Sequence, residues 1–109
     1  MKNVANVSSP LWRYRMRRIQ AFHGTFLFDD SNNRDIQNYS YMISGLYDET
    51  WEKDTCEIIY TLRDPNKIFL DIGAWIGPIS MYASPFYKKV IAIEADKIAI
   101  RSFIKNTKH

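Results

Sequence analysis

The second half of the chain alternates between short apolar runs and amphipathic stretches. Residues 67–71 and 90–94 are each an apolar, mostly β-prone run that ends in an acid. Continuous runs of this kind are typical of strands buried on both faces. Residues 78–84 are typical of a short helix with proline in its first turn, and residues 97–107 predict a helix with one apolar face made of Ile100, Phe103 and Ile104. The order strand, helix, strand, helix predicts an α/β fold with parallel strands joined by a right-handed crossover.

A further helix is predicted upstream of this unit. Residues 48–62 carry most of their charges off one helical face, and that face consists of Trp51, Thr55, Ile58, Ile59 and Leu62. Asp64-Pro65-Asn66 ends the stretch, because a residue that precedes proline is pushed out of the helical conformation.

The start of the chain allows two interpretations. Ser9-Pro10 is typical of a helix start, and apolar side chains recur at helical spacing from Trp12 to His23, so we favour a helix with His23 in a structural role. The same residues also alternate between large apolar side chains and arginines, which leaves a strand as the alternative.

The next stretch predicts a hairpin. Residues 25–28 are a β-prone run, residues 29–33 are a dense cluster of turn formers, and residues 36–43 are expected to return as a second strand before Gly45 breaks the chain. We therefore divide the chain into residues 1–44, a helix or hairpin segment of unassigned role, and residues 45–109, the α/β part.

The residues most informative about chemistry lie where the first predicted parallel strand ends. Asp71-Ile72-Gly73-Ala74-Trp75-Ile76-Gly77 links that strand to its helix, and Glu94 closes the next strand. A glycine turn here is expected to bring free backbone N–H groups and a positive helix end to the carboxyl edge of the sheet, where doubly wound folds bind ligands. An acid about 20 positions after the turn can accept hydrogen bonds from ribose hydroxyls. The pattern indicates a ligand that contains a nucleoside.

Two residues argue against a dinucleotide. A dinucleotide fingerprint has a middle glycine that lets the backbone approach the pyrophosphate, and here Trp75 occupies that position. Asp71 beside the turn would also repel phosphate. S-adenosyl-L-methionine carries a sulfonium and an ammonium group and no phosphate, so it fits both residues. An NAD-type Rossmann oxidoreductase is the less favoured enzyme alternative.

Residues 68–77 and 90–96 resemble the first two motifs of class I S-adenosylmethionine-dependent methyltransferases, and more narrowly those of the FkbM-type methyltransferase family. That family favours Asp-x-Gly-Ala-Asn-x-Gly, then Glu-Pro-Asp, and an asparagine that closes the next helix. Asn106 matches the last feature. Trp75 replaces the usual asparagine, and Ala95 replaces the usual proline.

The resemblance implies a Rossmann-like methyltransferase fold that transfers a methyl group to an oxygen or other nucleophile of a small-molecule or sugar acceptor. It implies that Glu94 holds the cofactor ribose, with Ala95 and Asp96 near the adenine edge. Trp75 belongs to the same candidate site, where it stacks on the cofactor or substrate or, as we favour, packs on the neighbouring helix or on a strand missing from this chain. The methionine end of the cofactor would be lined by Asp71, Gly73, Ala74 and Gly77.

The family fold has further strands after its second helix, and these supply the acceptor site and any general base. We therefore expect an incomplete parallel sheet, and we interpret the chain as a methyltransferase fragment that lacks its C-terminal half and is inactive alone. A small domain that completes its sheet by forming an oligomer is one alternative. An inactive nucleoside-binding or interaction fragment is another.

Composition narrows the function classes further. The 109 residues suit one domain, and 46% hydrophobic with 25% charged residues is typical of a globular chain. The single cysteine, Cys56, excludes an internal disulfide or a multi-cysteine metal site, and we expect it in the core. The lack of a disulfide framework favours a cytoplasmic location. No apolar run approaches the roughly 20 residues of a membrane-spanning helix.

The charge of the chain is unevenly distributed. The net charge is +3, with five basic and no acidic residues in 1–20, an acidic excess in 21–71 and a basic excess in 72–109. This alternation argues against a nucleic-acid partner, because proteins that bind nucleic acids gather lysine and arginine on one face. The rival candidate for an anionic partner is the aromatic-interleaved run Arg13, Arg15, Arg17 and Arg18.

Overall fold

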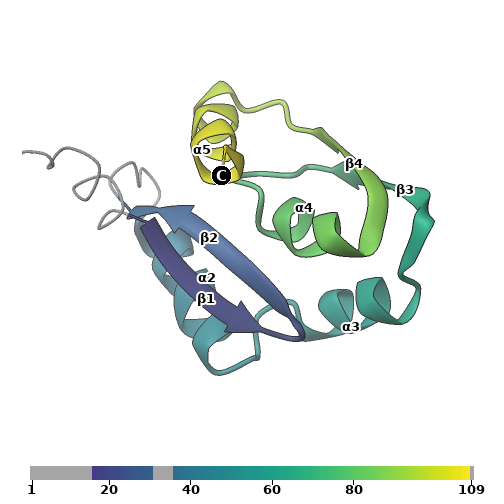
Figure 1. The fold of residues 1–109 in the computed structure, drawn as a ribbon. Helices are drawn as coiled ribbons and strands as arrows, with labels where there is room; N and C mark the ends of the chain where they lie inside the picture. Colours follow the sequence, from purple (N-terminus) through teal and green to yellow (C-terminus); the bar gives the residue numbers. More distant parts are fainter. Residues whose placement is uncertain (1–15, 31–35, 109) are drawn as a thin grey trace, which may run out of the picture.

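The protein is an α/β structure with two small sheets, one antiparallel and one parallel. The structure is a computed structural model that describes residues 16–30 and 36–108 (Figure 1). In chain order its elements are β1 (Met16–Ala21), β2 (Gly24–Asp29), α2 (Ile36–Tyr47), α3 (Lys53–Thr61), β3 (Asp64–Ile72), α4 (Pro78–Ala83), the 3-10 turn η2 (Ser84–Phe86), β4 (Tyr87–Ile93) and α5 (Lys97–Thr107).

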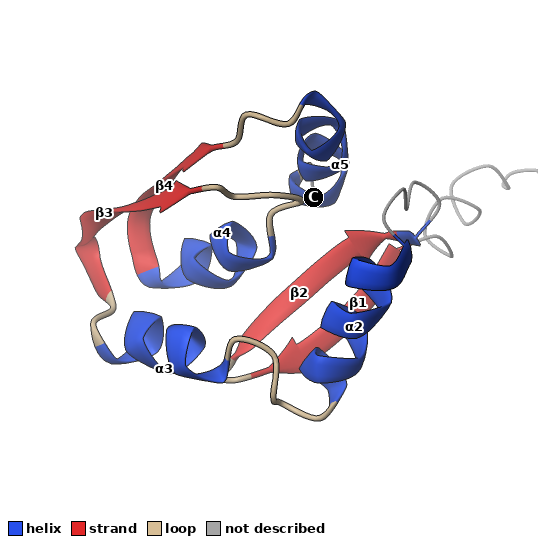
Figure 2. Ribbon diagram, turned by 180° about the vertical axis from the view of Figure 1, so that it is seen from behind, coloured by secondary structure: helices blue, strands red, loops and turns tan. Residues whose placement is uncertain are grey.

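The short helix α4 packs between the two sheets. It packs against β2 of the antiparallel hairpin and against both strands of the parallel pair, while α2 packs on β1 and α5 on β2 (Figures 1 and 2). The core lies among the hairpin, α2, α3 and α4, and its largest fully buried side chains are Tyr82, Phe26, Phe28, Met42, Leu46 and Cys56. The hairpin and the parallel pair therefore share one hydrophobic core.

The favoured helix near the start is wrong over the described residues, and the alternative strand is correct. Met16–Ala21 pairs antiparallel with Gly24–Asp29, in a register that places Ala21 opposite Gly24. Phe22 and His23 form the two-residue turn with positive φ angles of 53° and 75°, the conformation that matches the twist of a hairpin. Ser9-Pro10 lies outside the described residues.

His23 differs from its expected place on an apolar stripe. It is exposed at the tip of the hairpin, where its ring stacks on Tyr60 with centroids 4.2 Å apart. Its role is therefore a surface packing contact between the hairpin and α3.

The predicted strand over residues 36–43 is also wrong, because this segment belongs to α2. Its buried side chains are Tyr39, Met42 and Leu46, a spacing of three and four residues that fits one face of a helix. Gly45 lies inside this helix, and a Cβ atom there would come within 2.6 Å of the Trp51 Cβ atom. A close contact with Trp51, and not a chain break, explains that glycine.

The predicted elements of the second half are confirmed. β3 and β4 are parallel, α4 connects them, and α5 has the predicted bounds. Within the predicted helix 48–62, the structure has α3 from Lys53. The buried side chains of α3 are those of Cys56 and Ile59, so Cys56 is a core residue as expected, and burial raises the pKa of its thiol to about 12.

One prediction about the parallel strands fails in the described chain. Both strands were expected to be buried on two faces, but only the face toward α4 is covered. The opposite face exposes a row of apolar side chains, namely Ile68, Leu70, Ile72, Ile91 and Ile93. The helices show the same trend, since Ile58, Leu62 and Ile104 were predicted on apolar faces and are exposed.

Candidate functional site

The two parallel strands bring the candidate site residues to one edge. Ile72 pairs with Ile93, so both strands end at the same place. The backbone amides of Gly73 and Ala74 donate to the carbonyl oxygen of Ile93 at 2.8 and 3.0 Å. The turn and the end of β4 are therefore joined directly.

Glu94 contacts the middle of the turn. Its Oε1 accepts a hydrogen bond from the Trp75 amide at 2.6 Å, and its Oε2 accepts one from the Asp96 amide at 2.9 Å. A carboxylate oxygen has two acceptor positions, so each oxygen can still accept a second hydrogen bond. The carboxylate is partly exposed and is thus held in place with acceptor capacity left for a ligand hydroxyl.

The expectation of free backbone N–H groups in the turn is wrong for four of its residues. The amides of Gly73 and Ala74 already donate to the Ile93 carbonyl, and the Trp75 amide donates to Glu94. The Gly77 amide donates to the Ala74 carbonyl at 2.9 Å. These groups cannot also cradle a phosphate. The turn supports the ends of two strands, and the partly exposed Glu94 carboxylate, not these amides, is available for a ligand.

The backbone bonds to Glu94 lower its pKa below the ordinary value of 4.5, because the Asp96 and Trp75 amides favour the charged form. The ionised carboxylate therefore stabilises the folded chain at pH above 4.5, and this contribution is lost as pH falls through the lowered value. We expect the Glu94 side-chain carboxyl to titrate by NMR with a midpoint below 4.5, and the Trp75 amide shift to follow it. A midpoint at or above 4.5 would contradict the contact, and Glu94→Gln should abolish the Trp75 transition.

Asp71 lies at the same edge but is buried. Only 9% of the residue is exposed, and its Oδ2 accepts a hydrogen bond of 2.6 Å from the Ser80 hydroxyl of α4. Its partner in the register is Ala92, two positions before Glu94. Since alternate residues of a strand point to one face, Asp71 and Glu94 both project to the face that α4 covers.

The turn depends on residues with positive φ. Gly73 has φ +77° and Gly77 has φ +99°, and Trp75 adopts +55° without the freedom of glycine. Trp75 is partly buried and packs on the hydrophobic core, which agrees with the favoured packing interpretation. Asparagine tolerates this conformation better than tryptophan does, so packing of the large ring offsets an unfavourable backbone angle.

Asp96 and Ala95 follow Glu94 at the start of α5. The Asp96 side chain accepts hydrogen bonds from the Ile98 and Ala99 amides and caps the helix, whereas Ala95 is exposed. An aspartate just before an amphipathic stretch is a helix-start signal, so this structural role could have been found in the sequence.

Asn106 ties three parts of the fold together. The side chain is buried, its oxygen accepts from the Asp29 amide at 2.7 Å, and its nitrogen donates to the Ile76 carbonyl at 2.9 Å. The residue that closes α5 thus joins the hairpin to the glycine turn. In the sequence Asn106 is only a match to the family pattern, and no sequence signal indicates this structural role.

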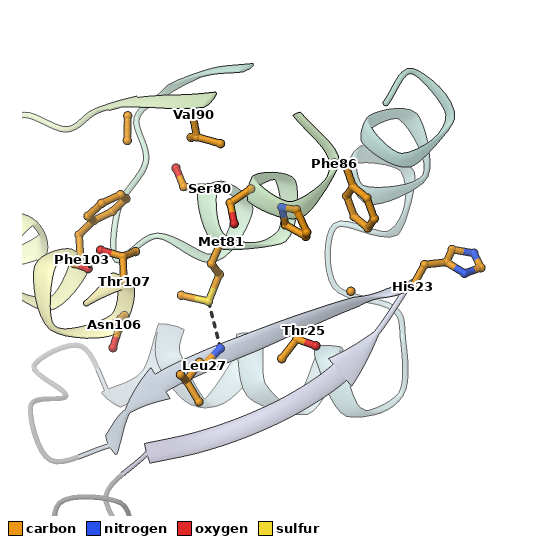
Figure 3. A pocket seen from close by; sticks show the side chains of 14 residues that line it. His23, Thr25, Leu27, Ser80, Met81, Phe86, Val90, Phe103, Asn106 and Thr107 are labelled. Atoms are coloured by element: carbon orange, nitrogen blue, oxygen red, sulfur yellow. Dashed lines mark hydrogen bonds between the residues drawn. The ribbon is translucent and has the colours of Figure 1, made fainter. Parts of the chain in front are cut away.

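A cavity of about 820 Å³ lies between β2, α4, β4 and α5 (Figure 3). Its lining is mainly apolar, with polar contributions from His23, Thr25, Ser80, Ser84, Asn106 and Thr107. None of the eight candidate cofactor residues lines it. The cavity therefore neighbours the predicted site through Ser80 without containing it, and sequence reasoning gave no sign of it.

The remaining predictions concern ions and membranes. Arg17 forms an ion pair with Asp30 at 3.0 Å, which occupies one member of the arginine run, while Arg13 and Arg15 lie outside the described residues.

Residues 16–30 and 36–108 contain no group of three or more side chains suited to a metal ion. Over the same ranges, every helix is too short or too polar to span a bilayer.

Comparison of this chain with family models, curated proteins and solved structures found no match. The resemblance to methyltransferases therefore depends on the motif residues of the sequence.

Proposed function

We propose that this chain provides the nucleoside-binding part of an S-adenosyl-L-methionine-dependent methyltransferase of the FkbM type, with a Rossmann-like fold. The observation that carries the proposal is the 2.6 Å hydrogen bond from the Trp75 amide to Glu94. It joins the glycine turn after one parallel strand to the acid after the next. This is the juxtaposition that recognition of a ribose beside such a turn requires.

The electrostatics of this edge favour a cationic ligand over a phosphorylated one. Asp71 and Glu94 both face the side of the sheet that α4 covers, and the amides that would bind a phosphate are already used. A pyrophosphate would meet two carboxylates and few free donors. A sulfonium and an ammonium group would meet favourable charge, which supports S-adenosyl-L-methionine over NAD.

When bound, the cofactor supplies an electrophilic methyl group on its sulfonium. Glu94 is proposed to accept hydrogen bonds from the ribose hydroxyls, and Asp71 to face the ammonium group. The short turn at Gly73 and Ala74 leaves room for the methionine end, since a Cβ atom added at Gly73 would meet nothing within 4 Å. The chain would thereby contribute orientation of the methyl group toward a small-molecule or sugar hydroxyl.

Calorimetric titration of the 109-residue chain tests the proposal. We expect S-adenosylhomocysteine and S-adenosyl-L-methionine to bind and NAD not to bind. Glu94→Ala should weaken both adenosyl compounds roughly 10- to 100-fold, the effect of losing hydrogen bonds to a charged group. Glu57→Ala is the matched control, because Glu57 is an exposed acid on α3 paired with Lys53.

Each other result has a defined meaning. Binding of NAD with equal or greater affinity would support the oxidoreductase alternative. Binding of the adenosyl compounds without turnover of a labelled methyl donor would fit a nucleoside-binding part that is not active alone. Equal affinities for the wild type and Glu94→Ala would contradict the role assigned to Glu94.

A further inference from the structure

The Asp71 carboxylate is buried with a single partner. Asp71 is 9% exposed and Ser80 is 3% exposed, and the Ser80 hydroxyl donates to Oδ2 at 2.6 Å. Within residues 16–30 and 36–108, no other hydrogen bond or ion pair reaches this carboxylate. A buried carboxylate without a cation costs free energy unless further donors satisfy it. Its second oxygen, Oδ1, therefore has no hydrogen-bond or ion-pair partner among the described residues.

No cation of the described chain is placed to pair with Asp71. The two ion pairs there join Arg17 to Asp30 and Lys53 to Glu57. A cation supplied by a ligand would remove the cost, and the proposed cofactor carries an ammonium group. Charge-assisted hydrogen bonds to carboxylates are about twice as strong as neutral ones, so the orientation of this carboxylate matters for affinity.

We propose that Ser80 is a positioning residue that holds Oδ2 of Asp71 and thereby presents Oδ1 to the ammonium group of the ligand's amino-acid end. This inference rests on the proposed function and adds a residue that acts through Asp71. Ser80 can hold Asp71 because α4 begins directly after the turn and packs on both parallel strands. A carboxylate fixed in advance loses less rotational freedom on binding.

The surroundings of Ser80 define a conservative variant. Ser80 lines the cavity between α4 and β4, and Figure 3 shows its side chain on the side of α4 that faces Val90. Because Ser80 lines that cavity, we expect the additional methyl group of threonine to extend into it while the hydroxyl stays in reach of Asp71. Ser80→Thr should therefore retain the function that Ser80→Ala loses.

Two ligands separate positioning from a general loss of structure. S-adenosylhomocysteine carries the ammonium group, whereas 5′-deoxy-5′-methylthioadenosine has the same adenosine and thioether without the amino-acid end. We expect Ser80→Ala to weaken S-adenosylhomocysteine roughly tenfold, the scale of one hydrogen bond to a charged group, and methylthioadenosine less than about twofold. Ser80→Thr and the exposed control Ser84→Ala should bind both compounds as the wild type does.

Asp71→Asn provides a second test should Ser80→Ala prove unfolded in a thermal melt. It keeps the shape of the side chain and removes its charge, so we expect the same selective loss of S-adenosylhomocysteine. Wild-type affinity for that ligand in Asp71→Asn, or an equal loss of both ligands in Ser80→Ala, would overturn the inference. If the wild-type chain binds methylthioadenosine as tightly as S-adenosylhomocysteine, the amino-acid end adds no affinity. That result would overturn the role of Ser80 but would agree with the proposed nucleoside site. A wild-type chain that binds neither compound overturns the proposed function, and this inference with it.

Discussion

Phe26→Ala lowers the free energy of unfolding by about 3–5 kcal/mol, the range for truncating a buried aromatic residue. Phe26 is fully buried, its ring stacks on Tyr82 at 5.5 Å between centroids, and β2 pairs it with the buried Ile19 of β1. The Tyr82 hydroxyl is itself bound to the Phe22 carbonyl oxygen, so its ring is not free to move into the gap. Because single domains are stable by about 5–15 kcal/mol, the loss removes much of the total.

Urea unfolding followed by circular dichroism measures this effect. Leu62→Ala is the control, because Leu62 directly follows α3 and is 66% exposed, and the substitution should change stability by less than about 0.5 kcal/mol. A loss of similar size in both variants would mean that the core does not lie between the hairpin and α4.

Gly77→Ala is the second substitution with a large expected effect, a loss of about 2–5 kcal/mol in the free energy of unfolding. The residue has φ +99°, where a side chain is strained by about 1–2 kcal/mol, and a Cβ atom would lie 2.9 Å from the ring of Phe103 in α5. Overpacking adds about 1–3 kcal/mol, because α5 is anchored by Asn106 and cannot retreat freely.

Gly73→Ala is a matched control in the same turn. It has φ +77° with nothing near its added Cβ atom, so only the backbone strain of about 1–2 kcal/mol applies. Thermal melts of the two variants should rank Gly77→Ala as clearly less stable. Equal melting temperatures would show that α5 does not pack on the turn as described.

The second half of the fold could be predicted because local pattern and tertiary structure agree there. The apolar runs that end in Asp71 and Glu94 form parallel strands, and α5 begins where Asp96 caps it. The site residues are adjacent for the same reason, since consecutive strands of a βαβ unit end at one edge.

The first half could not be predicted in the same way. The turn at Phe22 and His23 lacks the glycine or asparagine that marks a hairpin, so the sequence before it predicts a helix as readily as a strand. Residues 36–43 are short and rich in β-prone side chains, and only the continuation to Leu46 reveals the helical spacing of α2. Tertiary contacts with the core override local propensity in both segments.

The sequence also could not predict which backbone amides of the turn are hydrogen-bonded or which apolar side chains of the strands are exposed. The glycine pattern indicated a turn, but not that the Gly73 and Ala74 amides would bind the end of β4. The apolar run of β3 indicated two buried faces, whereas Leu70 and Ile72 are exposed. Which groups remain open to a ligand depends on partners that are distant in the sequence.

The central claim is that the turn 73–77 and Glu94 together bind an adenosyl ligand, and amide chemical shifts of the isotope-labelled chain test it most directly. Addition of S-adenosylhomocysteine should move the amide signals of Gly73, Ala74 and Trp75 and those following Glu94, with Thr25 and Leu27 at the cavity unchanged. Shifts confined to the cavity, or no shifts at millimolar ligand, would contradict the account.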